Sequence, residues 1–184
     1  LETIEDALVV ENNRSLIDLT GLSRLSRIEV GMFINENPSL TSLTGLDSLP
    51  RTGYFNVNDN ESLTSLGDLP ALTNIDYGIE INENRSLTDI SGLFSVREVS
   101  FGIYIRNNEA LCTTNAFKFL DGLTDGSDEY NFDDNNDDCD DDGVDISADC
   151  DDDDETLGDT ADDGDCDGVD IEYDCDDGDA TIGE

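Results

Sequence analysis

The 184-residue chain carries 47 Asp and Glu residues against 8 Lys and Arg and no His, which gives a formal net charge of −39. This charge excludes nucleic acid as a partner, because the phosphate backbone would be repelled. The charge is uneven: 17 acids and 8 bases precede residue 121, for a net −9, whereas 30 acids and no base follow, for a net −30. No apolar run approaches the roughly 20 residues of a membrane-spanning helix, so we expect no transmembrane segment.

The first part of the chain is an internal repeat. An Asn recurs at spacings of 24, 23, 24 and 24 residues, a Leu follows each Asn by three, and an alternating apolar pair precedes it. Such short alternation is typical of a strand with one inward face, so the repeat predicts a mainly β solenoid. The Asn and Leu columns are Asn13, Asn37, Asn60, Asn84 and Asn108, and Leu16, Leu40, Leu63, Leu87 and Leu111; the pairs are Leu8 and Val10, Met32 and Ile34, Phe55 and Val57, Ile79 and Ile81, and Ile103 and Ile105.

The Asn column is predicted to point inward. A buried Asn can bond backbone groups of its own coil and of the next, which satisfies donors and acceptors that a bend leaves without partners. Three members, Asn13, Asn60 and Asn84, also lie in Asn-x-Ser sequons. They would be glycosylation sites only if their amides pointed outward and the chain passed through a eukaryotic secretory route.

The first residues match the interior of a coil, since Leu1 and Ile4 align with Leu25 and Ile28 one repeat later. We therefore expect the first coil to expose core side chains and strand edges around Leu1, Ile4, Leu8 and Val10. Either upstream residues or another molecule would cover it. The second option predicts head-to-tail self-association, because contacts of this kind that do not close produce filaments.

The repeat Ser-Leu-Thr-x-Leu-x-Gly-Leu-x-x-Leu, followed by Ile-x-Ile-x-x-Asn, resembles the receptor L-domain type of leucine-rich repeat over about residues 1–112. The resemblance implies a right-handed β-solenoid on a cell surface that binds or scaffolds rather than catalyses. It also implies a short C-terminal capping helix after Leu111-Cys112. Thr113 or Thr114 would be the N-cap, and Phe117 and Leu120 would turn onto the last coil.

The last part of the chain repeats one acidic phrase at an offset of 25 residues, with 12 of 17 aligned positions identical. Each copy reads D-x-D-x-D-G-x5-D, the calcium-loop pattern with Asp in place of the final Glu. Alternate carboxylates converge on one point, the glycine lets the backbone turn, and the carbonyl of Val144 or Val169 adds an oxygen. An acidic tract can also be a solvated, disordered tail, but a random tail would not keep its Gly, Val, Ile and Cys in register.

The sequence therefore predicts at least two bound Ca²⁺ ions, which would supply folding free energy to a segment without a core. The acids that run on past each loop would complete the coordination shell or hold a second ion. The predicted ligands are Asp138, Asp140, Asp142, Val144, Asp149, Asp151, Asp152 and Asp154 in the first loop, and Asp163, Asp165, Asp167, Val169, Asp174, Asp176, Asp177 and Asp179 in the second.

This acidic tail is similar to metal-binding repeats of secreted bacterial proteins and, more loosely, to thrombospondin type 3 repeats. It departs from the latter at loop position 9, where Ile146 and Ile171 replace the usual acid. The chain is thus expected to comprise a solenoid with its capping helix (1–120), an acidic linker (121–137) and two tandem calcium-binding repeats (138–184). The resemblance implies a secreted or cell-surface protein of bacterial origin.

The five cysteines lie in a context where disulfides are the usual means of stabilisation, which points outside the cytoplasm. The preferred pairing is Cys112 with Cys139 and Cys150 with Cys166, which leaves Cys175 for a residue beyond the sequence or for another chain. Zinc is the rival interpretation, but there is neither a C-x-x-C motif nor a His. The sequence does not decide between the possible pairings.

Catalysis finds little support, because the chain has no His, one lysine (Lys118), no Gly-rich phosphate loop and no nucleophile elbow. We expect a non-enzymatic protein: a calcium-stabilised extracellular structural or adhesive module, which could self-assemble into a filament or surface layer. The alternative is a module that recognises a protein or glycan on the solenoid face. The aromatic residues Phe33, Tyr54, Phe101 and Tyr104 are a candidate contact patch there, although scattered surface apolar residues are common.

Overall fold

The computed structural model describes residues 1–124, 129–137 and 139. The fold is mainly β, with parallel sheets and few helices. The chain divides into two units, residues 1–111 with 115–135, and residues 112–114 with 136–184. The first unit contains the repeats.

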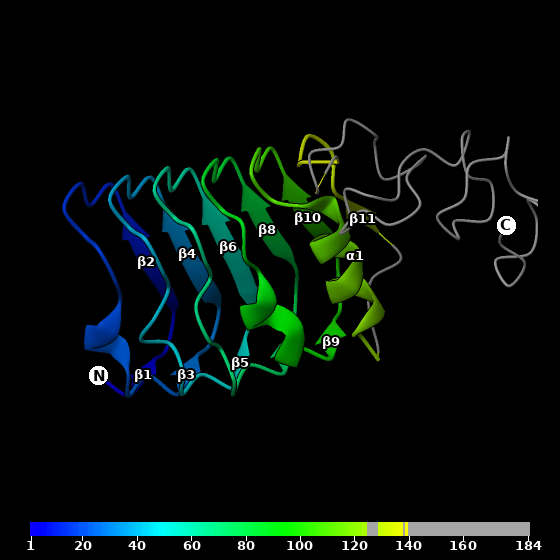
Figure 1. Ribbon diagram of the computed structural model, residues 1–184. Helices are drawn as coiled ribbons and strands as arrows, with labels where there is room; N and C mark the ends of the chain where they lie inside the picture. Colours follow the sequence, from blue (N-terminus) through cyan, green and yellow to red (C-terminus); the bar gives the residue numbers. More distant parts are fainter. Residues whose placement is uncertain (125–128, 138, 140–184) are drawn as a thin grey trace, which may run out of the picture. The chain divides into compact units, whose positions relative to one another are not determined.

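Six parallel strands form the largest sheet, in the order β11-β10-β8-β6-β4-β2. Figure 1 shows β2 to β10 side by side, each one repeat further along the chain. The strands are β2 (Ala7–Glu11), β4 (Gly31–Asn35), β6 (Tyr54–Asn58), β8 (Ile79–Asn82), β10 (Ile103–Arg106) and β11 (Tyr130–Asn131). Met32 lies opposite Phe55, and Phe55 lies opposite Ile79. The apolar residues of successive strands therefore form continuous columns, as the sequence predicts.

Shorter parallel strands stack at a second position in each repeat. They are β1 (Thr3–Ile4) with β3 (Arg27–Ile28), and β5 (Arg51–Thr52), β7 (Asn74–Ile75) and β9 (Glu98–Val99). Two 3-10 turns, η1 (Thr20–Leu22) and η2 (Ser91–Ser95), lie in the first and fourth repeats. Every strand pair joins residues about one repeat apart, so the backbone hydrogen bonds run from repeat to repeat.

The core consists of the repeated apolar columns. Leu40, Leu63, Leu87 and Leu111 are completely buried, as are both members of the pairs from Met32 onward. Burial of one such side chain contributes roughly 1.5–3 kcal/mol. In the first repeat Leu1 is 68% exposed, and Ile4, Val10 and Leu16 are only partly buried. Leu8 is buried, so the expectation that it is exposed is wrong. Self-association through this repeat stays a prediction.

The Asn column forms a buried hydrogen-bond ladder, which confirms the inward orientation. The Asn60 side-chain amide donates to the carbonyls of Ile34 at 2.8 Å and Asn58 at 3.0 Å. Its Oδ1 accepts from both the backbone and the side chain of Asn37, at 3.1 and 3.2 Å. Because Asn60 and Asn84 are completely buried, neither can accept a glycan in the folded protein.

The repeats continue beyond residue 112. Strand β11 pairs with β10, and Asn135 adds a sixth member to the ladder, accepting from the backbone of Asn108 at 3.2 Å. Phe132 is buried in the same core. These residues fall in the range that the sequence analysis treats as a linker, 121–137, and the sequence did not reveal their strand.

Helix α1 (Thr113–Asp121) lies where the capping helix was predicted. Its residues Ala116 and Phe119 are buried almost completely, whereas Phe117 is 40% exposed. The Phe117 ring packs edge-on against the Phe132 ring, with 5.3 Å between the ring centroids. The prediction that Phe117 and Leu120 turn onto the last repeat is thus right for Leu120, which packs against the core, and wrong for Phe117, whose place Phe119 takes. No helix among the described residues is long and apolar enough to cross a membrane.

The ladder gives a testable prediction about stability. Asn60→Ala would leave the buried carbonyl of Ile34 and the backbone N–H of Asn37 without these partners, so it should lower the free energy of unfolding by at least about 2 kcal/mol. Urea unfolding of the full chain measures this. The matched control is Asn13→Ala, since Asn13 belongs to the same ladder but is exposed to water. Equal losses in the two variants would contradict the ladder's role.

Candidate functional site

The predicted calcium ligands lie outside the described residues. Among residues 1–124, 129–137 and 139, no group of three or more Asp, Glu, His or Cys side chains could hold a metal ion. The calcium sites therefore stay a prediction. They comprise Asp138, Asp140, Asp142, Val144, Asp149, Asp151, Asp152, Asp154, Asp163, Asp165, Asp167, Val169, Asp174, Asp176, Asp177 and Asp179.

One predicted disulfide is present in the second unit. Cys112 is bonded to Cys139, with 5.2 Å between their Cα atoms. Next to it, the backbone N–H of Thr113 donates to the carbonyl of Asn136 at 2.8 Å, and the Thr113 hydroxyl donates to the Asp137 carboxylate. The first predicted pairing is thus confirmed, whereas Cys150, Cys166 and Cys175 lie outside the described residues.

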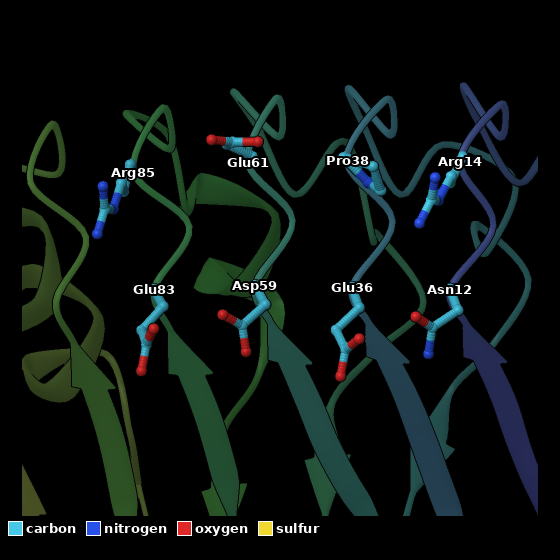
Figure 2. Close-up of a pocket in the computed structure, with 8 residues that line it drawn as sticks. All are labelled: Asn12, Arg14, Glu36, Pro38, Asp59, Glu61, Glu83 and Arg85. Atoms are coloured by element: carbon cyan, nitrogen blue, oxygen red, sulfur yellow. The ribbon is translucent and has the colours of Figure 1, made fainter.

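A first candidate site is a shallow groove of about 440 Å³ at the corner where the strands of the large sheet end. Figure 2 shows two parallel rows of side chains along it. Asn12, Glu36, Asp59 and Glu83 form the row nearest the strands. Arg14, Pro38, Glu61 and Arg85 form the other.

The first row of this corner groove has a left-handed backbone. Glu36, Asp59 and Glu83 have φ values of 55°, 55° and 60°. Most L-residues avoid this region, whereas Asn and Asp tolerate it. The conformation lets each backbone N–H bond the next repeat, as when Glu36 donates to the Asn58 carbonyl at 3.1 Å. The row concentrates negative charge, but among the described groups nothing else there points to a ligand.

A second candidate site is the aromatic groove, about 410 Å³, on the outer face of β6, β8 and β10. Three of its aromatic residues form a row, with ring centroids 4.8 Å apart for Tyr54 and Tyr77 and 6.2 Å apart for Tyr77 and Phe101. Phe33 extends this row beyond the groove, 6.1 Å from Tyr54. Tyr54, Tyr77 and Phe101 are 44%, 42% and 62% exposed. The candidate patch in the sequence is therefore a contiguous surface and not a scatter of apolar residues.

The opposite side of the aromatic groove is polar. Glu80 accepts a hydrogen bond from the Asn56 side chain at 2.6 Å, and the Tyr104 hydroxyl donates to the Glu129 carboxylate. This hydrogen bond raises the pKa of Tyr104 above its usual value, with smaller contributions from burial and from the nearby negative charge. The Arg106 guanidinium lies 5.4 Å from the centroid of the Tyr104 ring.

Tyr77 joins the aromatic row but was missed in the sequence. A signal was present, because Val30, Gly53, Tyr77 and Phe101 recur at the repeat spacing just before the strands. The third repeat is one residue shorter, so Tyr54 falls opposite Gly31 instead of in line with Tyr77. The four aromatic residues consequently occupy three columns, those of Phe33, of Tyr54, and of Tyr77 with Phe101, which hides the row from a search at one fixed period.

Comparisons with family models, with curated proteins and with solved structures give no match for this chain.

The Tyr104–Glu129 bond predicts a change in titration. Glu129→Ala should lower the pKa of Tyr104, because it removes both the acceptor and the negative charge. Ring ¹³C NMR of Tyr104 across alkaline pH measures the shift, and Glu80→Ala is the control because Glu80 contributes least. Since the folded-state pKa is raised, the bond stabilises the protein below about pH 10 and is lost as the pH rises further. An unchanged Tyr104 pKa in Glu129→Ala would contradict this.

Proposed function

We propose that the protein is a calcium-stabilised extracellular structural or adhesive module. In this proposal residues 1–120 and their extension form a right-handed β-solenoid of the receptor L-domain type, and residues 138–184 form two calcium-binding repeats. The chain acts without catalysis, at a bacterial cell surface or after secretion. Its partners are calcium and the surface to which it adheres.

The Cys112–Cys139 disulfide is the observation that carries this proposal. Cys112 directly follows Leu111, the last buried member of the Leu column, and Cys139 stands between the predicted ligands Asp138 and Asp140. A bond here closes the chain at the start of the first predicted calcium loop. Disulfides persist in oxidising, extracellular environments, and the closed segment loses conformational entropy before any ion binds.

A second candidate function is recognition of a partner on the outer face of the large sheet. The exposed aromatic groove favours it, because contiguous exposed apolar surface is typical of interaction sites. The two candidates differ in their response to calcium. Assembly that is lost on chelation supports the structural role, whereas a monomer that binds calcium and does not assemble supports recognition.

The proposed ions can be counted directly. Titration calorimetry of the full chain with Ca²⁺ should reveal at least two sites, and Asp142→Asn should abolish or strongly weaken one because it removes a carboxylate from the alternating set. Asp145→Asn, which removes the same charge outside that set, is the matched control. Fewer than two sites, or equal effects of the two substitutions, would refute the calcium proposal.

Chelation should open the tail and leave the repeats intact. Residues 8–105 are stabilised by buried apolar columns, whereas the tail has few apolar residues and carries a strong negative charge that only cations offset. Hydrogen exchange with and without chelator measures both regions in one experiment. If residues 8–105 exchanged as readily as residues 138–183 once calcium was removed, the proposed division of stability would be wrong.

A further inference from the structure

The aromatic groove is enclosed by side chains of defined kinds. Tyr77 and Phe101 line one side, Tyr54 closes one end, and Glu80 and Tyr104 line the other side, with Glu129 beyond them. These residues come from adjacent repeats, which the register of β6, β8 and β10 holds together. Glu80 and Tyr104 thus lie on the strands themselves, whereas Tyr77, Phe101 and the two glycines lie in the bends that lead into those strands.

Missing side chains create the hollow. Phe55, Ile79 and Ile103 pair across β6, β8 and β10 and point into the core. The residues directly before them, Tyr54, Gly78 and Gly102, therefore occupy equivalent outward positions. A Cβ on Gly78 would lie 2.8 Å from the Gly102 carbonyl oxygen, and a Cβ on Gly102 would lie 2.4 Å from the Tyr104 ring. Neither position accepts a side chain without a shift of its neighbours, and the Tyr104 ring reaches Glu129 across Gly102.

The electrostatic character of the groove selects a cation. Its described lining includes two carboxylates and no Lys, Arg or His. The faces of tyrosine and phenylalanine rings attract cations, and carboxylates bind them with charge-assisted hydrogen bonds. The net charge of −39 adds a long-range field that favours cations over anions.

We propose that this groove binds the guanidinium of an arginine side chain from an exposed segment of a partner protein. The planar guanidinium can stack on an aromatic ring while it donates several hydrogen bonds to carboxylates, and the groove offers both within one hollow. The protein already uses this pairing nearby, where Arg106 lies over the Tyr104 ring. This proposal depends on the recognition function proposed above, and it specifies the chemical group that the groove would recognise.

Glu80 and Tyr77 are the residues that define this specificity. Glu80 supplies negative charge, and its bond from Asn56 fixes the position of the carboxylate. Tyr77 lies at the centre of the aromatic row, between Tyr54 and Phe101. Tyr77 is 42% exposed, so part of its ring is accessible to a ligand.

The test uses the full chain, saturated with Ca²⁺ and labelled with 3-fluorotyrosine, in ¹⁹F NMR titrations near physiological salt. The ligand is the blocked peptide Gly-Gly-Arg-Gly-Gly, and the reference is the same peptide with neutral citrulline. The Arg peptide should shift the signals of Tyr54, Tyr77 and Tyr104 but not that of Tyr130, with a dissociation constant of about 1 mM. The citrulline peptide should bind at least about fivefold more weakly.

Two pairs of matched variants distinguish binding in the groove from attraction to the acidic tail. Glu80→Gln should weaken binding about threefold, whereas Glu83→Gln, which removes the same charge in the corner groove, should leave it unchanged. Tyr77→Ser should weaken binding about threefold to tenfold, whereas Tyr130→Ser should have little effect because Tyr130 is an exposed tyrosine that stacks on Phe132 and does not line the groove.

Three results would overturn the inference. Equal binding of the Arg and citrulline peptides would exclude selection by charge. Equal effects of Glu80→Gln and Glu83→Gln would assign the binding to general electrostatic attraction. Shifts of Tyr54 and Tyr77 with a neutral oligosaccharide such as cellotetraose, in the absence of shifts with the Arg peptide, would assign the groove to a glycan. The proposed recognition function would survive that last result, so the two failures are distinguishable.

Discussion

The buried asparagine ladder is the constraint on which the repeats depend. Each inner Asn bonds its own repeat and both neighbours. Asn60 bonds the backbones of Ile34 and Asn37 in the preceding repeat and of Asn58 in its own, and it donates to the Asn84 side chain in the next. These groups belong to a corner where a left-handed residue such as Asp59 reverses the chain, and a corner without the amide would bury unpaired carbonyls. The ladder therefore fixes where every repeat turns, and the apolar columns can align only because the corners do.

The same alignment makes the outer surface sensitive to repeat length. Inside the sheet, Phe55 stays in register with Met32 although the third repeat is one residue shorter than its neighbours. The difference is absorbed outside the core, where Tyr54 occupies a position that Gly31 and Gly78 occupy in adjacent repeats. Tyr54 thus lies at one end of the aromatic groove without any change in the register of the core strands.

Much of the repeat architecture could be predicted, because Asn and Leu columns at constant spacing report directly on stacking. Strand β11 could not, since Asn135 follows Asn108 by 27 residues and breaks the period. The inward face of helix α1 was assigned to Phe117 instead of Phe119 because a short helix offers too few turns to fix its phase. Tyr77 was missed because the members of the aromatic row belong to three different columns of the repeat. The calcium loops stay a prediction from the sequence, because their residues lie outside the part of the chain that the structure describes.

Charge explains why the two halves of the chain need different means of stabilisation. The first 120 residues carry a net −9 spread over a surface with a large apolar core beneath it, whereas the remainder carries −30. Hydrophobic burial can hold the former together, whereas charge repulsion opposes compaction of the latter, and bound cations or covalent closure would offset that repulsion. The Cys112–Cys139 disulfide lies near this boundary. It constrains the start of the acidic segment whether or not calcium is bound, so in the proposed function calcium would organise only the residues beyond it.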